Sequence, residues 1–208
     1  MFEELLKRYP SLTCCGADIR KTLECWIRCF ENGGKLLICG NGGSCADGEH
    51  IVGELMKGFL KNRPLSAAQR SEMKKNYPQV PDAYLEKLQN GLPAIALPSF
   101  GALNSAFGND GDAELIYGQP LMGLGRQGDV LLCISTSGNS GNVVAAAQIG
   151  KALGLTVVGL TGKSGGKLKG IADICICVPE TETFKVQELH LPVYHYLCGA
   201  TEAHFYPV

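Results

Sequence analysis

Five apolar runs of strand length, alternating with helical patterns, most constrain what this 208-residue chain can fold into. The runs are KLLICG (35–40), PAIALPS (93–99), DVLLCIS (129–135), TVVGLTG (156–162) and ADICICV (172–178). Because nearly every position in them is apolar, rather than every second one, both faces of each strand should be buried. Buried strands that alternate with helices predict a parallel sheet with right-handed crossovers, which is a doubly wound α/β fold.

Helical patterns occupy the segments between these runs, over 17–30, about 46–59 and 141–154. In the first of them, apolar residues recur at intervals of three and four from Ile19 to Phe30, and Gly33 ends the pattern. Residues 1–33 are therefore predicted to form an N-terminal helical segment. The length of the whole chain and its 45% hydrophobic content suit one globular domain spanning 1–208.

Residues 61–92 interrupt the alternation with a charged segment that contains three prolines. The segment carries two short helical patterns, the second of which we expect to be capped by Asp82 and ended by Gly91. It is too short and too polar to form a core of its own, which predicts a surface insertion and not a separate domain. The sequence leaves open whether it covers the functional site or a subunit edge.

Composition argues against several classes of partner. The formal net charge is −1, from 19 basic and 20 acidic residues, so no strong field is expected to gather nucleic acid or a membrane surface. The first residues are charged where a signal peptide needs an apolar run, and no stretch approaches the roughly 20 apolar residues of a membrane span. We expect a cytoplasmic protein with a small soluble ligand.

The ten cysteines contain no C-x-x-C pair, and several fall inside the apolar runs. This distribution is typical of reduced thiols that are buried as small apolar residues. Cys25 and Cys29 lie four residues apart on a predicted helix, but no His or carboxylate in the sequence is evidently aimed at them.

A hydroxyl-rich loop, TSGNSGN, follows the third apolar run and precedes a helix. Its glycines let the backbone approach a ligand closely, and the start of the helix adds free N–H groups at a positive dipole end. An ordinary turn with a serine cap would explain one or two such residues, but not a cluster of four hydroxyls. The loop therefore predicts a phosphate site, with hydroxyls from Ser135, Thr136, Ser137 and Ser140.

A second loop, GNGGS (40–44), has the same placement after the first apolar run and offers Asn41 and Ser44. Glycine turns between a strand and a helix are common, so this loop alone is a weaker indication. Neither loop matches G-x-x-x-x-G-K-[ST] or G-x-G-x-x-G, which favours a simple phosphate ester over a nucleotide. Ligands of doubly wound folds collect at the carboxyl ends of the strands, where both loops are expected.

Together, GNGGS, the following H-x-x-x-E, ISTSGNS, LTGKSGG and QELHLPVYH resemble the phosphoheptose isomerase branch of the sugar isomerase (SIS) family. The motifs occur in the family's order from Gly34 to about His195, outside the insertion. The resemblance implies a flavodoxin-like sheet, a homotetramer with active sites between subunits, and conversion of sedoheptulose 7-phosphate to the corresponding aldoheptose 7-phosphate.

The resemblance also implies roles for individual residues. Glu54 and His195 match the catalytic pair, while His50, Glu54, Gln187 and His195 match the metal-binding residues, which usually hold zinc. The substrate-binding positions are matched by Asn41, Ser44, Asp110, Ser135, Thr136, Ser137, Ser140 and Gln187.

The chemistry of these residue types supports the implied roles. Interconversion of a ketose and an aldose removes a proton beside a carbonyl, forms an enediol and returns the proton to the neighbouring carbon. A carboxylate such as Glu54 can take that proton, and His195 or a zinc ion can stabilise the oxygens. His50 and Glu54 are four residues apart, roughly 6 Å between Cβ atoms, and so share one helix face.

The C-terminal motif poses a geometric problem. Gln187 and His195 lie about 80° apart around an ideal helix, against about 140° for His190 and His195, so the face favours Gln187. Eight residues also span roughly 12 Å of rise, which is far for two ligands of one ion. Leaning side chains, a bent helix or two subunits would resolve it. Pro192 could kink this helix, unless the helix begins near Leu189.

Two alternatives stay open at this point. Some SIS proteins bind sugar phosphates without catalysis, including a regulator of bacterial replication initiation, and that branch does not generally keep the Glu and His pair. An isomerase of another sugar phosphate is the second alternative, because the insertion leaves the helix that carries His50 and Glu54. The remaining histidine of the motif, His190, is expected to be a packed and hydrogen-bonded core residue.

Overall fold

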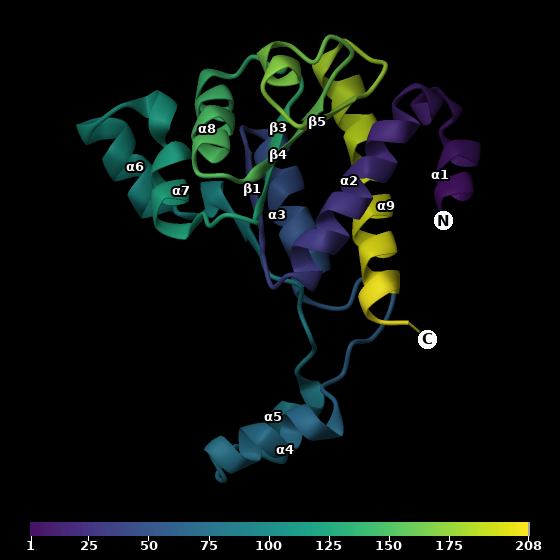
Figure 1. Ribbon diagram of the computed structural model, residues 1–208, viewed down its shortest axis with the longest axis vertical. Helices are drawn as coiled ribbons and strands as arrows, with labels where there is room; N and C mark the ends of the chain where they lie inside the picture. Colours follow the sequence, from purple (N-terminus) through teal and green to yellow (C-terminus); the bar gives the residue numbers. More distant parts are fainter. Residues whose placement is uncertain (208) are drawn as a thin grey trace.

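A computed structural model describes residues 1–207 of the chain, which form a five-stranded parallel sheet with helices on both faces (Figure 1). The strand order is β2-β1-β3-β4-β5, all pairs being parallel. The strands are β1 (Leu36–Gly40), β2 (Ala94–Ala96), β3 (Val130–Ser135), β4 (Thr156–Thr161) and β5 (Ile174–Cys177). This is the flavodoxin-like order, and it confirms the predicted doubly wound fold.

The run 93–99 is strand only over its first half, because Leu97–Ser99 turns into a short 3-10 helix, η2, that contains Pro98. Proline has no N–H to give to the sheet, which ends the pairing of β2. The other four runs form strands over most of their predicted length.

Alternate residues of each strand serve two hydrophobic layers. Leu36 and Ile38 pack on one face, while Leu37 and Cys39 pack on the other, and all four are almost completely buried. The first face carries α1 (Phe2–Arg8), η1 (Pro10–Cys15), α2 (Gly16–Glu31), α3 (Gly43–Met56) and α9 (Thr183–Phe205). The second carries α7 (Gly118–Leu124), α8 (Gly141–Ala152) and η4 (Lys167–Gly170), with α6 (Gly101–Asp110) and η3 (Ala113–Leu115) at its outer side (Figure 1).

The amino ends of the strands are fixed by a polar contact between Lys35 and Asp129. The Lys35 ammonium donates to Asp129 Oδ2 at 2.6 Å, and the backbone N–H of Lys35 donates to Oδ1 at 2.9 Å. Lys35 precedes β1 and Asp129 precedes β3, so the pair ties two neighbouring strands together at one edge. The opposite edge, where these strands end, is left to the two glycine-containing loops.

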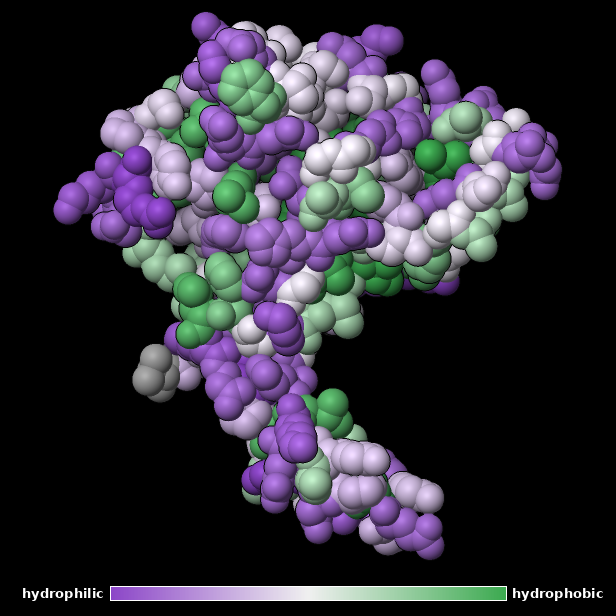
Figure 2. Space-filling model, turned by 180° about the vertical axis from the view of Figure 1, so that it is seen from behind, coloured by the Kyte–Doolittle hydropathy of each residue, from purple (hydrophilic) through white to green (hydrophobic). Residues whose placement is uncertain are grey.

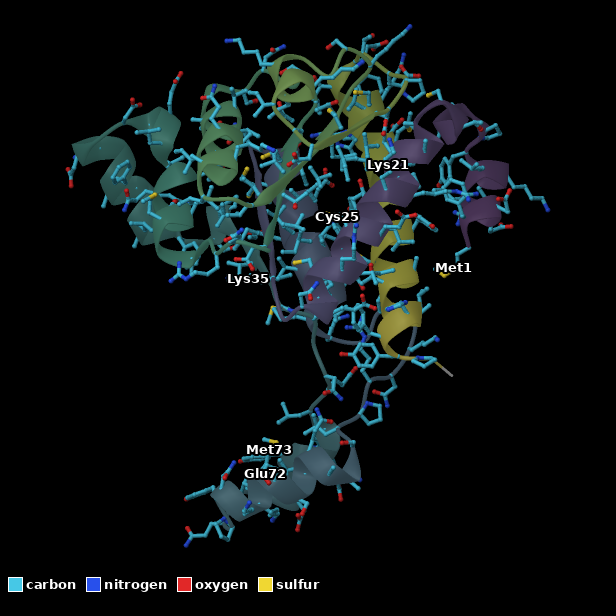
Figure 3. All side chains as sticks on the ribbon, viewed as in Figure 1. Met1, Lys21, Cys25, Lys35, Glu72 and Met73 are labelled. Carbon is cyan, nitrogen blue, oxygen red and sulfur yellow. The ribbon has the colours of Figure 1, made fainter. Side chains whose placement is uncertain are left out.

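The insertion, residues 61–92, projects from the body as an arm of two helices, α4 (Ala67–Asn76) and α5 (Asp82–Lys87) (Figures 1 and 2). Leu85 is the one buried residue of these helices, as expected for a segment without a core. Ser66 caps α4 in a reciprocal capping box with Gln69. The exposed side chains of the arm include Glu72 and Met73 (Figure 3).

The predicted bounds of the second arm helix were wrong. Pro81 occupies the N-cap position and Asp82 is the first helical residue. The Asp82 carboxylate accepts the ammonium of Lys74 at 3.0 Å instead of capping its own helix. The helix ends at Lys87, before Gly91, whose Cβ position would lie 2.7 Å from the carbonyl oxygen of Met56. Gly91 is thus required for contact with the end of α3, and not for a helix stop.

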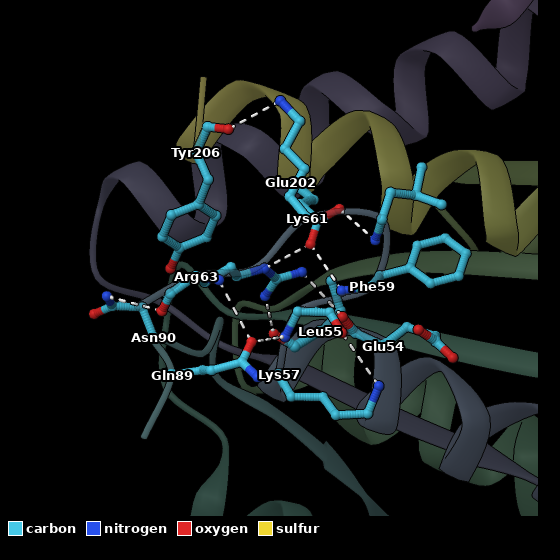
Figure 4. Close-up of polar contacts among 12 residues, drawn as sticks. Glu54, Leu55, Lys57, Phe59, Lys61, Arg63, Gln89, Asn90, Glu202 and Tyr206 are labelled. Carbon is cyan, nitrogen blue, oxygen red and sulfur yellow. Dashed lines mark hydrogen bonds and ion pairs between the residues drawn. The ribbon is translucent and has the colours of Figure 1, made fainter. Parts of the chain in front are cut away.

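A buried ion pair fixes the base of the arm to the body (Figure 4). Arg63 Nε donates to Glu202 Oε1 at 2.8 Å, and both side chains are fully buried. The same guanidinium donates to the carbonyl oxygens of Leu55 at 2.6 Å and Glu54 at 3.0 Å, at the C-terminal end of α3. The arm, α3 and α9 are therefore joined at one point.

Glu202 is the centre of this cluster. It also accepts the backbone N–H groups of Phe59 and Leu60, each at 2.8 Å. Burial raises the pKa of Glu202, but these two bonds and Arg63 outweigh it, so the pKa lies below its usual range.

All ten cysteines are free. Six of them are buried, including Cys39 and Cys133 of the apolar runs. Cys14 is exposed, and the other three are partly exposed, including Cys175 and Cys177 of the last run. Burial raises the pKa of Cys25 and Cys29, the pair on α2. Among the helices of residues 1–207, none has the length and apolar character needed to cross a membrane.

Candidate active site

Two loops lie side by side at the carboxyl edge of the sheet, because β1 and β3 are neighbours and Gly40 pairs with Ile134. The glycine loop, residues 40–44, turns directly from β1 into α3. A Cβ on Gly40 would lie 2.8 Å from the carbonyl oxygen of Ser44, and Gly42 has a φ of 54°. Both positions therefore require glycine. This tight turn also starts α3 at Gly43, three residues before the predicted start.

Asn41 joins the two loops. Its amide and that of Asn142, at the start of α8, donate to each other at 2.8 and 3.0 Å. The Tyr117 hydroxyl contacts both the Gly40 carbonyl oxygen and Asn41 Oδ1 at 2.8 Å. Asn142 lay within a motif singled out in the sequence, but nothing in the sequence around Tyr117 indicated this contact.

The serine loop, residues 135–141, supplies the predicted hydroxyls. Ser135 Oγ and Ser140 Oγ are 3.1 Å apart, and Ser137 Oγ accepts the backbone N–H of Asn139 at 3.1 Å. Ser140 is the N-cap of α8 but makes no side-chain cap bond. The first N–H groups of α8 are thus free of a serine cap, which suits an anion at this point.

The LTGKSGG motif supports the serine loop from behind. Gly138 has a φ of 67°, and a Cβ on it would lie 2.1 Å from the carbonyl oxygen of Gly165. The backbone N–H of Gly162 donates to the carbonyl of Thr136 at 3.0 Å. The backbones of the two motifs are therefore in direct contact.

Further along α3, His50 and Glu54 meet His195 of α9. His50 Nε2 and Glu54 Oε1 are 3.1 Å apart, as their spacing predicted. The His195 ring packs edge-on against His50, with centroids 5.1 Å apart, and its buried Nε2 has no hydrogen-bond partner. Burial and the neighbouring His50 lower the pKa of His195, and Glu54 opposes them. A neutral imidazole beside a carboxylate is suited to proton transfer.

His195 also borders a cleft of about 470 Å³ between the N-terminal helices, the segment after α3, and α9. Phe59 packs against the His195 ring with centroids 5.5 Å apart, and Leu60, Leu191 and Arg8 line the cleft. The cleft is mostly apolar, but Arg8 and Glu4 place charges at it.

Two further residues complete this cluster and were not predicted. The Tyr194 hydroxyl lies 3.0 Å from His50 Nδ1 and donates to Asp47 Oδ1 at 3.3 Å. Burial raises the pKa of Asp47 above its usual value, and the bond from Tyr194 and the nearby His50 offset only part of this rise. Asp47 precedes His50 by three residues on α3. The spacing of His50 and Glu54 indicated a shared helix face, but it could not show that α9 would place Tyr194 against Asp47 and His50.

Comparison with known proteins decides the family. Residues 85–162 match the family model described as SIS domain. A phosphoheptose isomerase from Burkholderia pseudomallei (strain K96243) is 38% identical over 186 residues, which cover 89% of this chain and 81% of the relative. The chain belongs to the phosphoheptose isomerase family.

Solved structures of this family have the same fold. The phosphoheptose isomerase from Neisseria gonorrhoeae gives a TM-score of 0.76 at 29% identity, with 97% of this chain and 95% of that chain covered. The phosphoheptose isomerase from Francisella tularensis gives 0.76 at 30% identity, covering 96% and 93%.

Not all of the positions that match the phosphoheptose isomerase family meet in one chain. Gln187 lies against the glycine loop, where a Cβ on Gly43 would be 2.2 Å from its Nε2. Gly43 and His50 are separated by seven helical residues, about 10 Å of rise. Gln187 is therefore placed with the phosphate loops. Of the three alternatives for Gln187 and His195, side chains that lean together are therefore not found within one chain.

Asp110 stands apart from the other predicted residues. It is the last residue of α6, a helix with no buried residues, and its carboxylate accepts the side-chain amide of Asn109 at 2.8 Å. No hydrogen bond or ion pair found in residues 1–207 joins Asp110 to either loop or to Glu54.

The helix α9 runs from Thr183 to Phe205 with Pro192 inside it, so of the two alternatives for Pro192, a helix start near Leu189 is excluded. His190 is fully buried, as expected, but the expected hydrogen bonds are absent: neither ring nitrogen has a partner in the described chain. Burial lowers the pKa of His190 to about 4, against a smaller opposite effect of the Thr161 backbone. His190 is thus a packed, neutral residue of the core.

The zinc ligands that the family implies do not fit together in a single chain. His50 and Glu54 bond to each other, and Gln187 lies near the glycine loop. Within residues 1–207, no three His, Cys, Asp or Glu side chains are arranged to hold one metal ion.

Proposed function

We propose that this chain converts sedoheptulose 7-phosphate to D-glycero-D-manno-heptose 7-phosphate through an enediol. The observation that carries the proposal is that His50 of α3 contacts both Glu54 on the same helix and His195 of α9. The helix α3 starts at the glycine loop. Membership of the phosphoheptose isomerase family supports the same substrate class.

The length of α3 suits a long substrate. Ser44 and Glu54 are separated by ten residues, about 15 Å of rise, and the side chain of Glu54 leans back toward the start of the helix. A seven-carbon sugar carries its phosphate at one end and its reacting carbonyl at the other. The phosphate would bind at the glycine and serine loops while C1 and C2 lie beside Glu54.

In this reaction Glu54 takes a proton from C1 of the ketose, and His195 takes the proton of the C1 hydroxyl and gives it to the C2 oxygen, so that the sugar passes through the enediol. The proton held by Glu54 then goes to C2. The C1 oxygen becomes the aldehyde and C2 becomes a carbinol carbon, so no atoms are gained or lost. The lowered pKa of His195 keeps a free imidazole available for the oxygen-to-oxygen transfer.

The test is an NMR time course of purified, metal-free protein with sedoheptulose 7-phosphate, with and without added zinc. Formation of the aldoheptose phosphate is expected in the wild type, and Glu54→Gln should reduce turnover about 10²- to 10⁴-fold while substrate still binds. Saturable binding without turnover would instead favour a sugar-phosphate regulator or an isomerase of another sugar. The comparison with added zinc tests the predicted cofactor.

We also propose a homotetramer and a cytoplasmic location. Exposed Phe184 and Leu191 on α9, together with the unburied face of α6, leave apolar surface that a second subunit would cover. Ten free cysteines suit a reducing compartment. Sedimentation of the full chain tests the first proposal, and a monomer at micromolar concentration would contradict it.

A further inference from the structure

Tyr194 of α9 contacts two side chains of α3, those of Asp47 and His50. Tyr194 is 1% exposed, and its ring packs edge-on to the His50 ring with centroids 5.5 Å apart. Its hydroxyl lies 3.0 Å from His50 Nδ1 and 3.3 Å from Asp47 Oδ1. A buried ring has few alternative rotamers, so packing fixes the position of the hydroxyl oxygen.

The contacts continue from His50 to the carboxylate of Glu54. Asp47, His50 and Glu54 are three and four residues apart and form one stripe along α3. His50 Nε2 faces Glu54 Oε1 at 3.1 Å, while Nδ1 faces Tyr194. Both nitrogens of the imidazole are therefore used, and the ring is fixed at two points.

Asp47 in turn fixes the direction of the tyrosine hydroxyl. Tyr194 is the one hydrogen-bond partner of the Asp47 carboxylate in the described chain, and Asp47 Oδ2 is buried without a partner. A buried carboxyl oxygen without a partner costs free energy. Packing of the core therefore does not explain why a carboxylate stands behind this tyrosine, whereas orientation of its hydroxyl does.

Without this hydroxyl, His50 would lose its fixed orientation. Its side chain is 43% exposed, so solvent leaves room for the ring to turn about χ2. Glu54, only 14% exposed, would then lose its one side-chain partner. Removal of one oxygen atom on α9 would thus loosen the proposed base on α3.

We propose that Tyr194 is a positioning residue: held by Asp47, it orients His50, which in turn holds the Glu54 carboxylate in place for proton abstraction. This inference rests on the proposed isomerase function. Tyr194 does not itself react with the substrate. Its contribution is to reduce the freedom of the base before the substrate arrives.

The test compares Tyr194→Phe with Tyr196→Phe in the full-length protein. Each variant removes one hydroxyl from α9 and keeps the ring, but the Tyr196 hydroxyl makes no hydrogen bond within residues 1–207. Tyr194→Phe should lower kcat for sedoheptulose 7-phosphate at least tenfold and change KM less than twofold. Tyr196→Phe should change neither value more than twofold.

A spectroscopic readout separates this inference from the proposed function. The chain has four histidines, and ¹⁵N imidazole resonances of the metal-free protein can be assigned to His50 with a His50→Gln variant. Tyr194→Phe should shift the Nδ1 resonance of His50 and leave that of His204, at the far end of α9, unchanged. Asp47→Asn should shift the same resonance, which provides a second variant if Tyr194→Phe does not fold.

A selective loss of kcat together with the His50 shift supports the inference. An unshifted His50 resonance overturns it, as does full kcat in Tyr194→Phe or an equal loss in Tyr196→Phe. If the wild type turns over no substrate, the proposed function fails, and the His50 resonance alone then decides whether Tyr194 orients that ring.

Discussion

The serine loop and the α3–α9 face, defined by His50, Glu54, Tyr194 and His195, are assembled in different ways. Ser135 and Ser140, whose hydroxyls touch, are five residues apart. His50 and Tyr194 are 144 residues apart, and Arg63 and Glu202, which lock the end of the same helix pair, are 139 apart. The first region needs a strand end, a turn and a helix start, whereas the second needs two complete helices in register.

The difference shows which part of the site is sensitive to distant changes. Backbone bonds and glycine contacts hold the serine loop, and they come from the sheet edge itself. Side-chain bonds hold the α3–α9 face, and a small slide of one helix would break the contacts of Tyr194 with His50 and Asp47. Phosphate binding should therefore tolerate damage that abolishes proton transfer.

Arg63→Met should cause the largest effect, because it removes the buried ion pair with Glu202 of α9. It leaves Glu202 buried without its cation, and loss of one partner from a buried pair costs about 3–5 kcal/mol of unfolding free energy. Urea unfolding measures the loss. Lys75→Met, which removes an exposed 3.7 Å pair with Glu72 on the arm, is the control and should cost less than about 1 kcal/mol.

The same variant separates the two regions of the site. Because Arg63 bonds the carbonyl of Glu54 and touches neither loop, folded Arg63→Met should lose turnover and still bind inorganic phosphate. A parallel loss of phosphate binding in protein shown to be folded would mean that the two regions are not independent.

The strands and loops could be predicted because their signals are local. The three central strands, β1, β3 and β4, are buried on both faces, so their composition alone indicates a central strand. The edge strands β2 and β5 are only partly buried, although their runs are equally apolar. The hydroxyls of the serine loop likewise lie within six residues of one another. The first turn of α3 was missed because Gly42 and Gly43, which usually indicate a turn, here form the N-cap and the first helical residue.

The helix pair could not be predicted to the same extent. Angles around an ideal helix correctly gave the shared face of His50 and Glu54, but they could not show what α9 places opposite. Nothing near Tyr194 indicates that Asp47 lies 3.3 Å away, and nothing near Arg63 indicates Glu202. Gln187 was paired with His195 by angle, although the rise along the helix separates them. Such contacts depend on packing between distant segments.

A pH titration of stability tests how tightly α9 holds its buried histidine. The pKa of His190 is about 4 in the folded chain and about 6.5 when exposed, so the unfolded chain binds the proton first as pH falls. This group's contribution is complete above pH 6.5 and is lost between pH 6.5 and 4. The loss reaches up to about 3 kcal/mol at the acid end.

His190→Leu should flatten that part of the profile. The measurement is urea unfolding of both proteins at several pH values, with the difference between their profiles isolating His190. If the unfolding free energies of the two proteins stay parallel from pH 7 to 4, the His190 ring is protonated as easily in the folded chain as in the unfolded chain. A hydrogen-bond partner or a water molecule would then have to stabilise its charged form.

Ser137→Ala combined with Ser140→Ala should have the smallest effect, and it tests the serine loop without changing the α3–α9 face. Loss of a serine hydroxyl that bonds a charged ligand costs about 1.5–3 kcal/mol of binding free energy. Bonds from the N–H groups of α8 to the same phosphate reduce this cost. We expect KM to rise on the order of tenfold to a hundredfold with kcat nearly unchanged, because Glu54 and His195 are untouched. Ser71→Ala, exposed on α4, is the matched control. Unchanged KM would move the phosphate away from the serine loop, whereas a large fall in kcat would mean that this loop helps to align the distant α3–α9 face.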